Sequence, residues 1–197
     1  MTIKRIRLLL WLLVAIAIAA LAMLLVRQPV EQAATEGTVA IGGPFTLTDG
    51  DGRPFSSAKL AGKPFAIFFG FTHCPDVCPT TLARLARLRG QLGGGDDSFA
   101  IVFVTVDPER DGPQEVDRYT ALFGTPVIGL TGSRAQIEQV KKKFGVFSQK
   151  VDQPGADYSV DHTAATFLFG SDGTFVATIA PDEGDDAALA KLKRILG

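Results

Sequence analysis

Residues 65–79 read FAIFFGFTHCPDVCP, and they are the most informative stretch about the fold. It opens on a run, residues 65–71, that has no polar side chain, which predicts a strand buried on both faces, as in a parallel or mixed sheet covered by helices. Pro79 disfavours the α conformation at Cys78, so the two cysteines are expected in a turn just ahead of a helix. That helix is indicated by leucines on one side of a 3.6-residue wheel, at Leu82, Leu85, Leu88 and Leu92. Together these features predict an α/β protein.

Further strand and helix patterns lie on both sides of this stretch. A hairpin turn signal (DGDG) stands at residues 49–52, and residues 99–106 form a second buried-strand pattern. The remaining expected elements are, in chain order, a helix from Pro113, a helix from Ser133, a hairpin at 171–173 and a closing helix from Asp185. A β-α-β unit followed by a β-hairpin and a closing helix is the thioredoxin-like arrangement.

An unbroken apolar run at residues 8–26 predicts a transmembrane helix. At about 1.5 Å per residue, such a run spans roughly the 30 Å hydrocarbon core of a bilayer. Lys4, Arg5 and Arg7 precede it, so the N-terminus is expected to stay in the cytoplasm while the rest is translocated. A cleaved signal peptide is the alternative, but its apolar region normally has only about 7–15 residues.

The chain is therefore expected to have four parts. These are a cytoplasmic N-terminus at 1–7, a membrane anchor at 8–26, a linker at 27–39 and a thioredoxin-like domain at 40–197. The apolar run has no Arg- and Ser-rich transit segment before it, which favours a bacterial cytoplasmic membrane over a mitochondrial one. The domain would then lie on the periplasmic, extracytoplasmic side.

The composition excludes some classes of protein. Lys and Arg number 20 against 21 Asp and Glu, a net charge of -1, which argues against a dedicated nucleic-acid binder. Only two cysteines occur, close together, so a disulfide framework is excluded. The pair is a redox pair, a metal site or a small local disulfide.

Cys74 and Cys78 stand where a buried strand is expected to pass into a helix. Functional groups of open α/β sheets gather there, and the helix N-terminus lowers the pKa of a nearby thiol. Thiolate is both the nucleophile and the metal ligand. Three residues separate the cysteines, whereas thioredoxins place two, so the match to a dedicated disulfide exchanger is loose. A disulfide between them is within reach, and a redox role stays open.

Two thiolates alone make a weak site for a soft metal, and His162 is the candidate third ligand. It precedes the strand pattern that begins at Phe167, in the segment that passes beside the active cysteines in the thioredoxin arrangement. Sulfur favours Cu(I) and imidazole tolerates Cu(II), so this ligand set suits copper. Zinc is the chemical rival. The other histidine, His73, adjoins Cys74 but is expected to point to the other side.

Three motifs are similar, in order, to those of the Sco/SenC family of copper chaperones. They are THCPDVCP at 72–79, VDPERD at 106–111 and DHTA at 161–164. The resemblance implies copper ligands at Cys74, Cys78 and His162. It also implies a role in assembling the dinuclear copper centre of cytochrome c oxidase.

Two acidic residues are candidates for a role beside the ligands. The resemblance implies that Asp107, which follows a strand and lies near the metal loop, shapes or gates the site. Asp76 lies between the cysteines. As a structural alternative, Asp76 serves only as a turn residue and Asp107 only as a strand-end residue.

The expected function is that of a copper-binding metallochaperone, not an enzyme. Its partners would be the copper-binding subunit of the oxidase, a copper donor, and a reductant for the disulfide that Cys74 and Cys78 form without metal. The alternative is a membrane-anchored thiol-disulfide oxidoreductase, which would not need His162. A peroxidase of the peroxiredoxin type is disfavoured, because Thr72 lies two rather than three residues before Cys74.

Overall fold

The computed structural model describes residues 7, 11–14, 16, 41–153 and 157–197. The chain divides into two units, Met1–Val39 and Ala40–Gly197, and the fold below is that of the second. Most of the expected anchor at 8–26, and all of the linker at 27–39, lie outside the described residues. Among the residues that are described, no helix has the length and apolar character needed to cross a bilayer.

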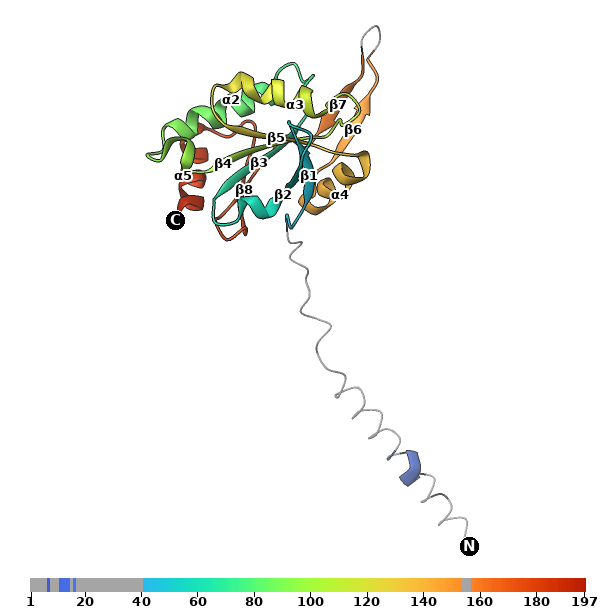
Figure 1. Ribbon diagram of the computed structural model, residues 1–197. Coiled ribbons are helices and arrows are strands. Elements are labelled where there is room, and N and C mark those ends of the chain that lie inside the picture. The colour runs from blue at the N-terminus through green and yellow to red at the C-terminus, as the bar shows by residue number, and fades with distance from the viewer. Residues whose placement is uncertain (1–6, 8–10, 15, 17–40, 154–156) are drawn as a thin grey trace. The chain divides into compact units, whose positions relative to one another are not determined.

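A seven-stranded mixed sheet forms the centre of this unit, with the strand order β2-β1-β5-β4-β3-β8-β9 (Figure 1). The middle strands β3, β4 and β5 are parallel, whereas β1 and β8 pair antiparallel with β5 and β3. The strands are β1 (Thr46–Asp49), β2 (Pro54–Ser56), β3 (Phe65–Gly70), β4 (Ala100–Thr105), β5 (Val127–Thr131), β8 (Thr166–Phe169) and β9 (Phe175–Ile179).

Helices cover the sheet on both faces (Figure 1). They are α2 (Val77–Gly90), α3 (Pro113–Thr120), α4 (Arg134–Phe144) and α5 (Asp185–Leu196), with 3-10 turns at Ser57–Leu60, Gly95–Asp97 and Ala121–Phe123. The capping box predicted at Ser133 is present and starts α4. The order β3-α2-β4, followed by the β8-β9 hairpin and α5, confirms the predicted α/β, thioredoxin-like arrangement.

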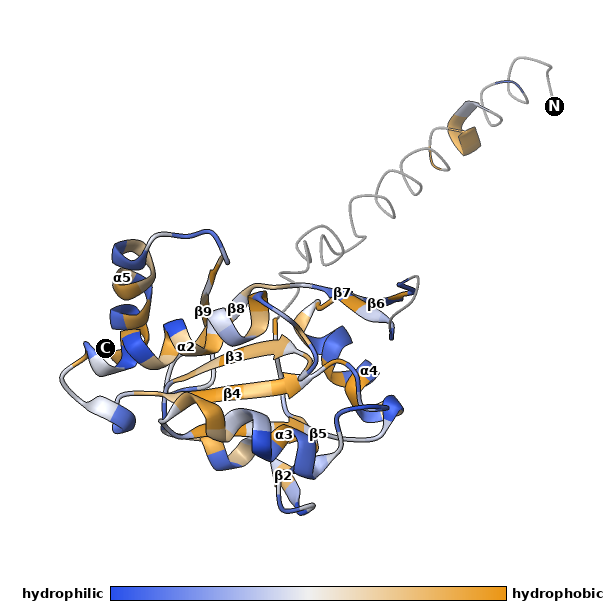
Figure 2. Cartoon of the chain, turned by 90° about the horizontal axis from the view of Figure 1, so that it is seen from above, coloured by the Kyte–Doolittle hydropathy of each residue, from blue (hydrophilic) through white to orange (hydrophobic). Residues whose placement is uncertain are grey.

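Every residue of β3 and β4 is buried, and Figure 2 shows both strands as hydrophobic along their length. On one face Phe69 of β3 packs against Phe144 of α4, with ring centroids 5.2 Å apart. On the other face Phe68 packs against Phe103 of β4. The loop that carries the cysteines therefore leaves the sheet from one of its fully buried strands, which fixes its starting point.

Two local features differ from the sequence prediction. The helix α2 begins at Val77, so Cys78 and Pro79 lie inside its first turn and not in a turn ahead of it. Proline is tolerated there because the first N–H groups of a helix have no partner within the helix.

The second difference is an additional hairpin. β6 (Ser148–Val151) pairs antiparallel with β7 (Ser159–His162) as a separate two-stranded sheet, with Ser148 opposite His162. Its polar sequence carries no apolar alternation, which is why the pattern did not reveal it.

Candidate metal centre

The two cysteines stand at the carboxyl end of β3 and the N-terminus of α2. The backbone N–H of Cys74 donates to the carbonyl of Phe71 at 3.3 Å, and the N–H of Cys78 donates to the Cys74 Sγ at 3.4 Å. Cys74 is partly exposed, whereas Cys78 is fully buried. A free helical N–H thus points at one sulfur, an arrangement that favours its thiolate.

Gly70, the last residue of β3, makes room for the buried sulfur. A Cβ at this position would lie 2.8 Å from the Cys78 Sγ and about as close to Phe68 and Phe103. Such an approach is shorter than van der Waals contact, so any side chain here would displace the thiol. The missing side chain of Gly70 is therefore part of the site.

His162 reaches the same point from the end of β7. Its Nε2 lies 3.5 Å from the Cys78 Sγ, and its Nδ1 lies 3.1 Å from the carbonyl oxygen of Thr163. A carbonyl only accepts, so Nδ1 carries the proton and the lone pair of Nε2 faces the sulfur. Phe68 and Phe71 meet the imidazole edge to face, with centroids 6.0 and 5.8 Å away, and hold its plane.

The three candidate ligands converge, since the Sγ atoms of Cys74 and Cys78 and a ring nitrogen of His162 all lie within 4.8 Å of one another. A metal ion bound at ordinary metal–sulfur and metal–nitrogen distances fits between them. Two soft sulfurs and one imidazole suit copper in both oxidation states. The donor set therefore fits the expected ion.

The two thiols share one negative charge. The hydrogen bond from the Cys78 thiol, together with the one from the Cys78 backbone N–H, lowers the pKa of Cys74 to about 4. The same hydrogen bond, together with burial, raises the pKa of Cys78. At neutral pH one thiolate is therefore present before any metal arrives, and it is the one that solvent can reach.

The other predicted residues take different positions. The exposed Asp76 stands just ahead of α2 and accepts from the Thr80 hydroxyl of that helix at 3.2 Å. Asp107 is buried and bonds to Arg110 and Tyr158, not to a ligand. His73 is exposed and is not among the converging groups.

Sequence reasoning missed the structural role of Asp111, which is fully buried. Its carboxylate accepts from the backbone N–H of Thr72 at 2.9 Å and from the hydroxyls of Thr72 and Thr105, both at 2.6 Å. It thereby holds the start of the cysteine loop to the end of β4. The VDPERD motif contained this residue, but only the structure shows which group it binds.

The chain is similar to known proteins over most of its length. The family model SCO1/SenC matches residues 33–197. The mitochondrial SCO2 protein of Saccharomyces cerevisiae is 39% identical over 160 residues, which cover 80% of this chain and 53% of that protein. This chain thus spans about half the length of that curated relative.

Two solved structures share the fold. Copper-bound ScoI of Bradyrhizobium japonicum is 41% identical, with a TM-score of 0.71 over 79% of this chain and 99% of that one. BsSco, a member of the Sco family of cytochrome c oxidase assembly proteins in which a disulfide switch was identified, is 27% identical, with a TM-score of 0.62 over 80% of this chain and 94% of that one.

Proposed function

This chain belongs to the SCO1/SenC family, and we propose that it carries copper to the dinuclear copper site of cytochrome c oxidase during assembly. The observation that carries the proposal is the convergence of Cys74, Cys78 and His162. The copper bound to ScoI and the oxidase-assembly role of the family that includes BsSco support it. Copper is the cargo, so its ligands must release it as well as hold it.

The exposures of the ligands set the order of release. Cys74 is the partly exposed sulfur and Cys78 the buried one. An incoming thiolate from the acceptor reaches the metal beside Cys74 and displaces that sulfur first, while Cys78 and His162 still hold the ion. Transfer then proceeds by exchange of one ligand at a time, and no bare ion forms.

The proposed location follows from the apolar run. Residues 8–26 would anchor the protein in a bacterial cytoplasmic membrane, with the domain on the extracytoplasmic side. That side is where the copper-binding subunit of the oxidase, a copper donor and a thiol reductant would meet it. A reporter enzyme that is active only outside the cytoplasm, fused after Gly197, should be active, and activity of a cytoplasm-only reporter there would contradict this location.

A second function is favoured by one observation. Cys74 combines partial exposure with a pKa lowered to about 4, as in the attacking thiol of a disulfide reductase. The buried Cys78 lies beside it to close a disulfide and release a mixed-disulfide partner. The same pair would then reduce the cysteines of the oxidase subunit instead of supplying metal.

A complementation experiment separates the two functions. A deletion strain should lose cytochrome c oxidase activity at low copper and regain part of it when copper is added. His162→Ala should fail to complement if the protein carries copper, and should succeed if it only exchanges thiols. His73→Ala, which changes the histidine outside the cluster, is the matched control and should complement in both cases. Full oxidase assembly in the deletion strain under copper limitation would contradict the oxidase role.

A further inference from the structure

The hairpin that carries His162 lies outside the main sheet. In the described part of the chain, β6 and β7 pair only with each other, and most of their side chains are exposed or half-buried. The main-sheet hydrogen bonds that hold the cysteine loop therefore do not hold the histidine. Other contacts must set its distance from the sulfurs.

Arg110 supplies such contacts from the loop after β4. Its Nη1 donates to the backbone carbonyl of Tyr158 at 2.8 Å and to the Asp157 carboxylate at 3.0 Å. Its Nε donates to the Asp107 carboxylate at 2.5 Å. One planar guanidinium thus joins the loop after β4 to the residues that lead into β7, a geometry that a single ammonium group cannot reproduce.

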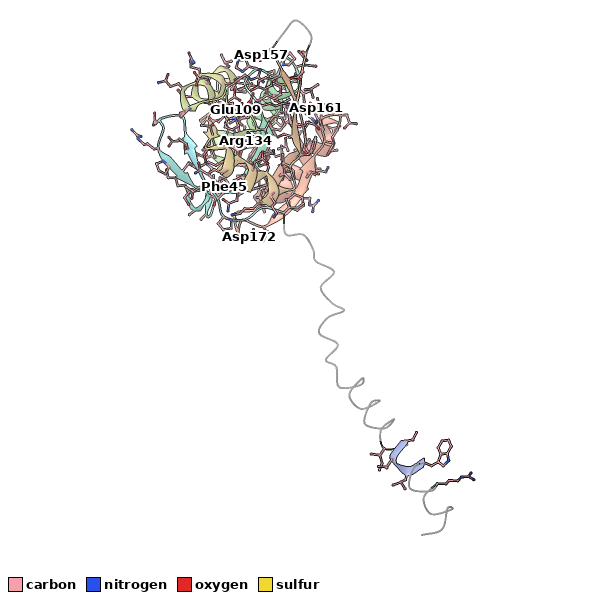
Figure 3. The ribbon with its side chains drawn as sticks, turned by 90° about the vertical axis from the view of Figure 1, so that its right-hand side faces the viewer. Phe45, Glu109, Arg134, Asp157, Asp161 and Asp172 are labelled. Atoms are coloured by element: carbon pink, nitrogen blue, oxygen red, sulfur yellow. The ribbon has the colours of Figure 1, made fainter. Side chains whose placement is uncertain are left out.

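Tyr158 completes the contact. Its hydroxyl donates to the other oxygen of the buried Asp107 at 2.9 Å, and the Arg110 guanidinium carbon lies 3.7 Å from the centre of its ring. We call Asp107, Arg110 and Tyr158 the hairpin clamp. Figure 3 shows Asp157, next to Tyr158 in the chain, at the far end of the domain from Asp172.

The clamp is tied to the same strand ends as the cysteines. The N–H of Val106, next to Asp107, donates to the carbonyl of Gly70 at 2.7 Å. The ring of Phe71 lies 5.9 Å from the Arg110 guanidinium and 5.8 Å from the His162 ring. Arg110 is therefore connected to the imidazole in two ways. It bonds to the backbone that leads into β7, and it packs on Phe71, which contacts the His162 ring.

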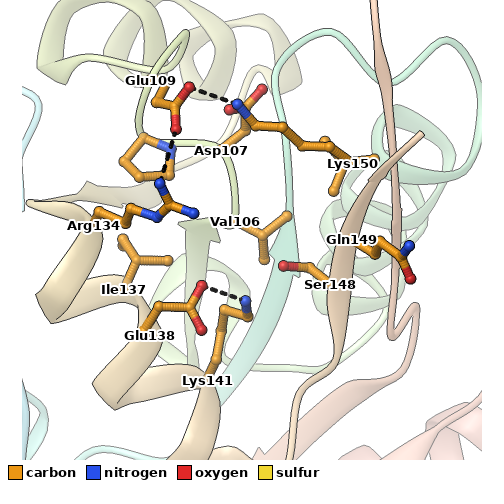
Figure 4. A pocket seen from close by; sticks show the side chains of 12 residues that line it. Val106, Asp107, Glu109, Arg134, Ile137, Glu138, Lys141, Ser148, Gln149 and Lys150 are labelled. Carbon is orange, nitrogen blue, oxygen red and sulfur yellow. Dashed lines mark hydrogen bonds and ion pairs between the residues drawn. The ribbon is translucent and has the colours of Figure 1, made fainter. Parts of the chain in front are cut away.

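A weaker link joins the same loop to the other strand of the hairpin. Glu109 pairs with Lys150 of β6 and, on its other side, with Arg134 of α4 (Figure 4). These side chains are all substantially exposed, so water and salt screen their pairing. Arg110, whose side chain is only 13% exposed, is the stronger contact.

We propose that Arg110 is a positioning residue for His162, and that the hairpin clamp decides how well the site holds Cu(II) relative to Cu(I). Two soft thiolates supply most of the affinity for Cu(I), whereas Cu(II) depends more strongly on the imidazole. Misplacing His162 therefore weakens Cu(II) binding selectively. The inference rests on the copper-binding function proposed above.

The test compares Arg110→Lys with Arg134→Lys in the full chain. Arg110→Lys keeps the charge beside buried Asp107 but loses the fork that also reaches Tyr158. Arg134→Lys makes the same change on α4, where the arginine pairs with Glu109 and, among the described residues, forms no ion pair with the hairpin. Tyr158→Phe is the second variant, which removes only the hydroxyl bond to Asp107.

Two measurements are made on each variant. In the metal-free protein, amide hydrogen exchange should be faster in β6 and β7 of Arg110→Lys and Tyr158→Phe, and unchanged in β3 and β4. With copper, Arg110→Lys should lose roughly 10- to 100-fold in Cu(II) affinity, as when the group that orients a metal-binding histidine is removed. Its Cu(I) affinity should stay within about twofold, and Arg134→Lys should match the wild type in hydrogen exchange and in both copper affinities.

Two results would overturn the inference. One is hairpin exchange and Cu(II) affinity in Arg110→Lys equal to those of Arg134→Lys. The other is an equal loss of Cu(I) and Cu(II) affinity with faster exchange everywhere, which would make Arg110 a residue of general stability. Failure of the oxidase role in the deletion strain would leave both measurements meaningful, so the two proposals fail separately.

Discussion

The two halves of the candidate site are held in different ways. The cysteine half grows out of β3, which is buried at every residue, and is fixed by the carboxylate of Asp111. The histidine half lies on a peripheral hairpin and is fixed by polar contacts at Arg110 and Tyr158. The sulfurs are therefore anchored to the buried core, whereas the position of the imidazole depends on polar contacts outside the main sheet. A carrier needs both properties, because it must select a metal and then release it.

Removing a ligand from the cysteine half should have the largest effect on copper binding. Cys74→Ala and Cys78→Ala each leave one thiolate and one imidazole, which are too few for a soft metal. We expect copper affinity to fall by more than about 100-fold in either variant, beyond the range for residues that only orient a ligand. Metal analysis after dialysis against a weak chelator measures this, and copper retained by the double variant would refute the ligand assignment.

Asp111→Asn should loosen the cysteine half without touching a ligand. In asparagine an NH2 group takes the place of one carboxylate oxygen of Asp111. A buried donor of Thr72 or Thr105 then loses the oxygen that accepted its hydrogen bond. We expect the free energy of unfolding to fall by about 1–3 kcal/mol, measured by urea denaturation of the metal-free protein. The exposed Asp117→Asn is the control and should change it by less than about 0.5 kcal/mol. Equal effects of the two changes would show that the hydrogen bonds of Asp111 do not stabilise the cysteine half.

Substitution of two glycines distinguishes an effect on core packing from an effect on metal binding. Gly70→Ala would place a Cβ 2.8 Å from the Cys78 Sγ, and Gly129→Ala would place one 2.6 Å from a methyl of Val116 on α3. Both should lower the free energy of unfolding by about 1–3 kcal/mol through overpacking. Only Gly70→Ala should also change the copper affinity and the thiolate-to-Cu(II) absorption band. An identical copper spectrum in the two variants would show that the missing Cβ of Gly70 serves packing alone.

The smallest expected effect concerns how the alkylation rate of Cys74 depends on pH in the metal-free protein. Because the pKa of Cys74 is about 4, its alkylation by iodoacetamide should be nearly constant from pH 6 to 8. An ordinary thiol would instead slow by about tenfold per pH unit below its pKa. The control is Cys78→Ala, in which the lost hydrogen bond should restore the ordinary pH dependence. A wild-type rate that rises tenfold per unit through this range would contradict the shared-charge arrangement.

The lowered pKa of Cys74 also makes the stability of the folded protein depend on pH. An unfolded cysteine has a pKa near 9.0, so between pH 4 and 9 the folded state binds fewer protons at Cys74 than the unfolded state. This contribution is complete above pH 9 and is lost as the pH falls toward 4. The raised pKa of Cys78 acts in the opposite direction, and only as the pH rises above 9.

The core and the candidate ligands could both be predicted from the amino-acid sequence. The unbroken apolar run before the cysteines predicts a strand buried on both faces, because only a chain without polar side chains tolerates helices on both sides. The placement of Cys74 and Cys78 after that strand follows from chain continuity over a few residues. The candidate role of His162 came from its place just before the Phe167 strand and from the DHTA motif at 161–164.

How the histidine half is held could not be predicted from the sequence. Arg110 and Tyr158 are 48 residues apart, and their contact depends on the path of α3, β5, α4 and the hairpin. The β6–β7 pairing is likewise invisible in a polar sequence, because its strands form by cross-strand hydrogen bonds and not by burial of one face. Local periodicity reports burial, whereas polar contacts between distant segments exist only once the chain has folded.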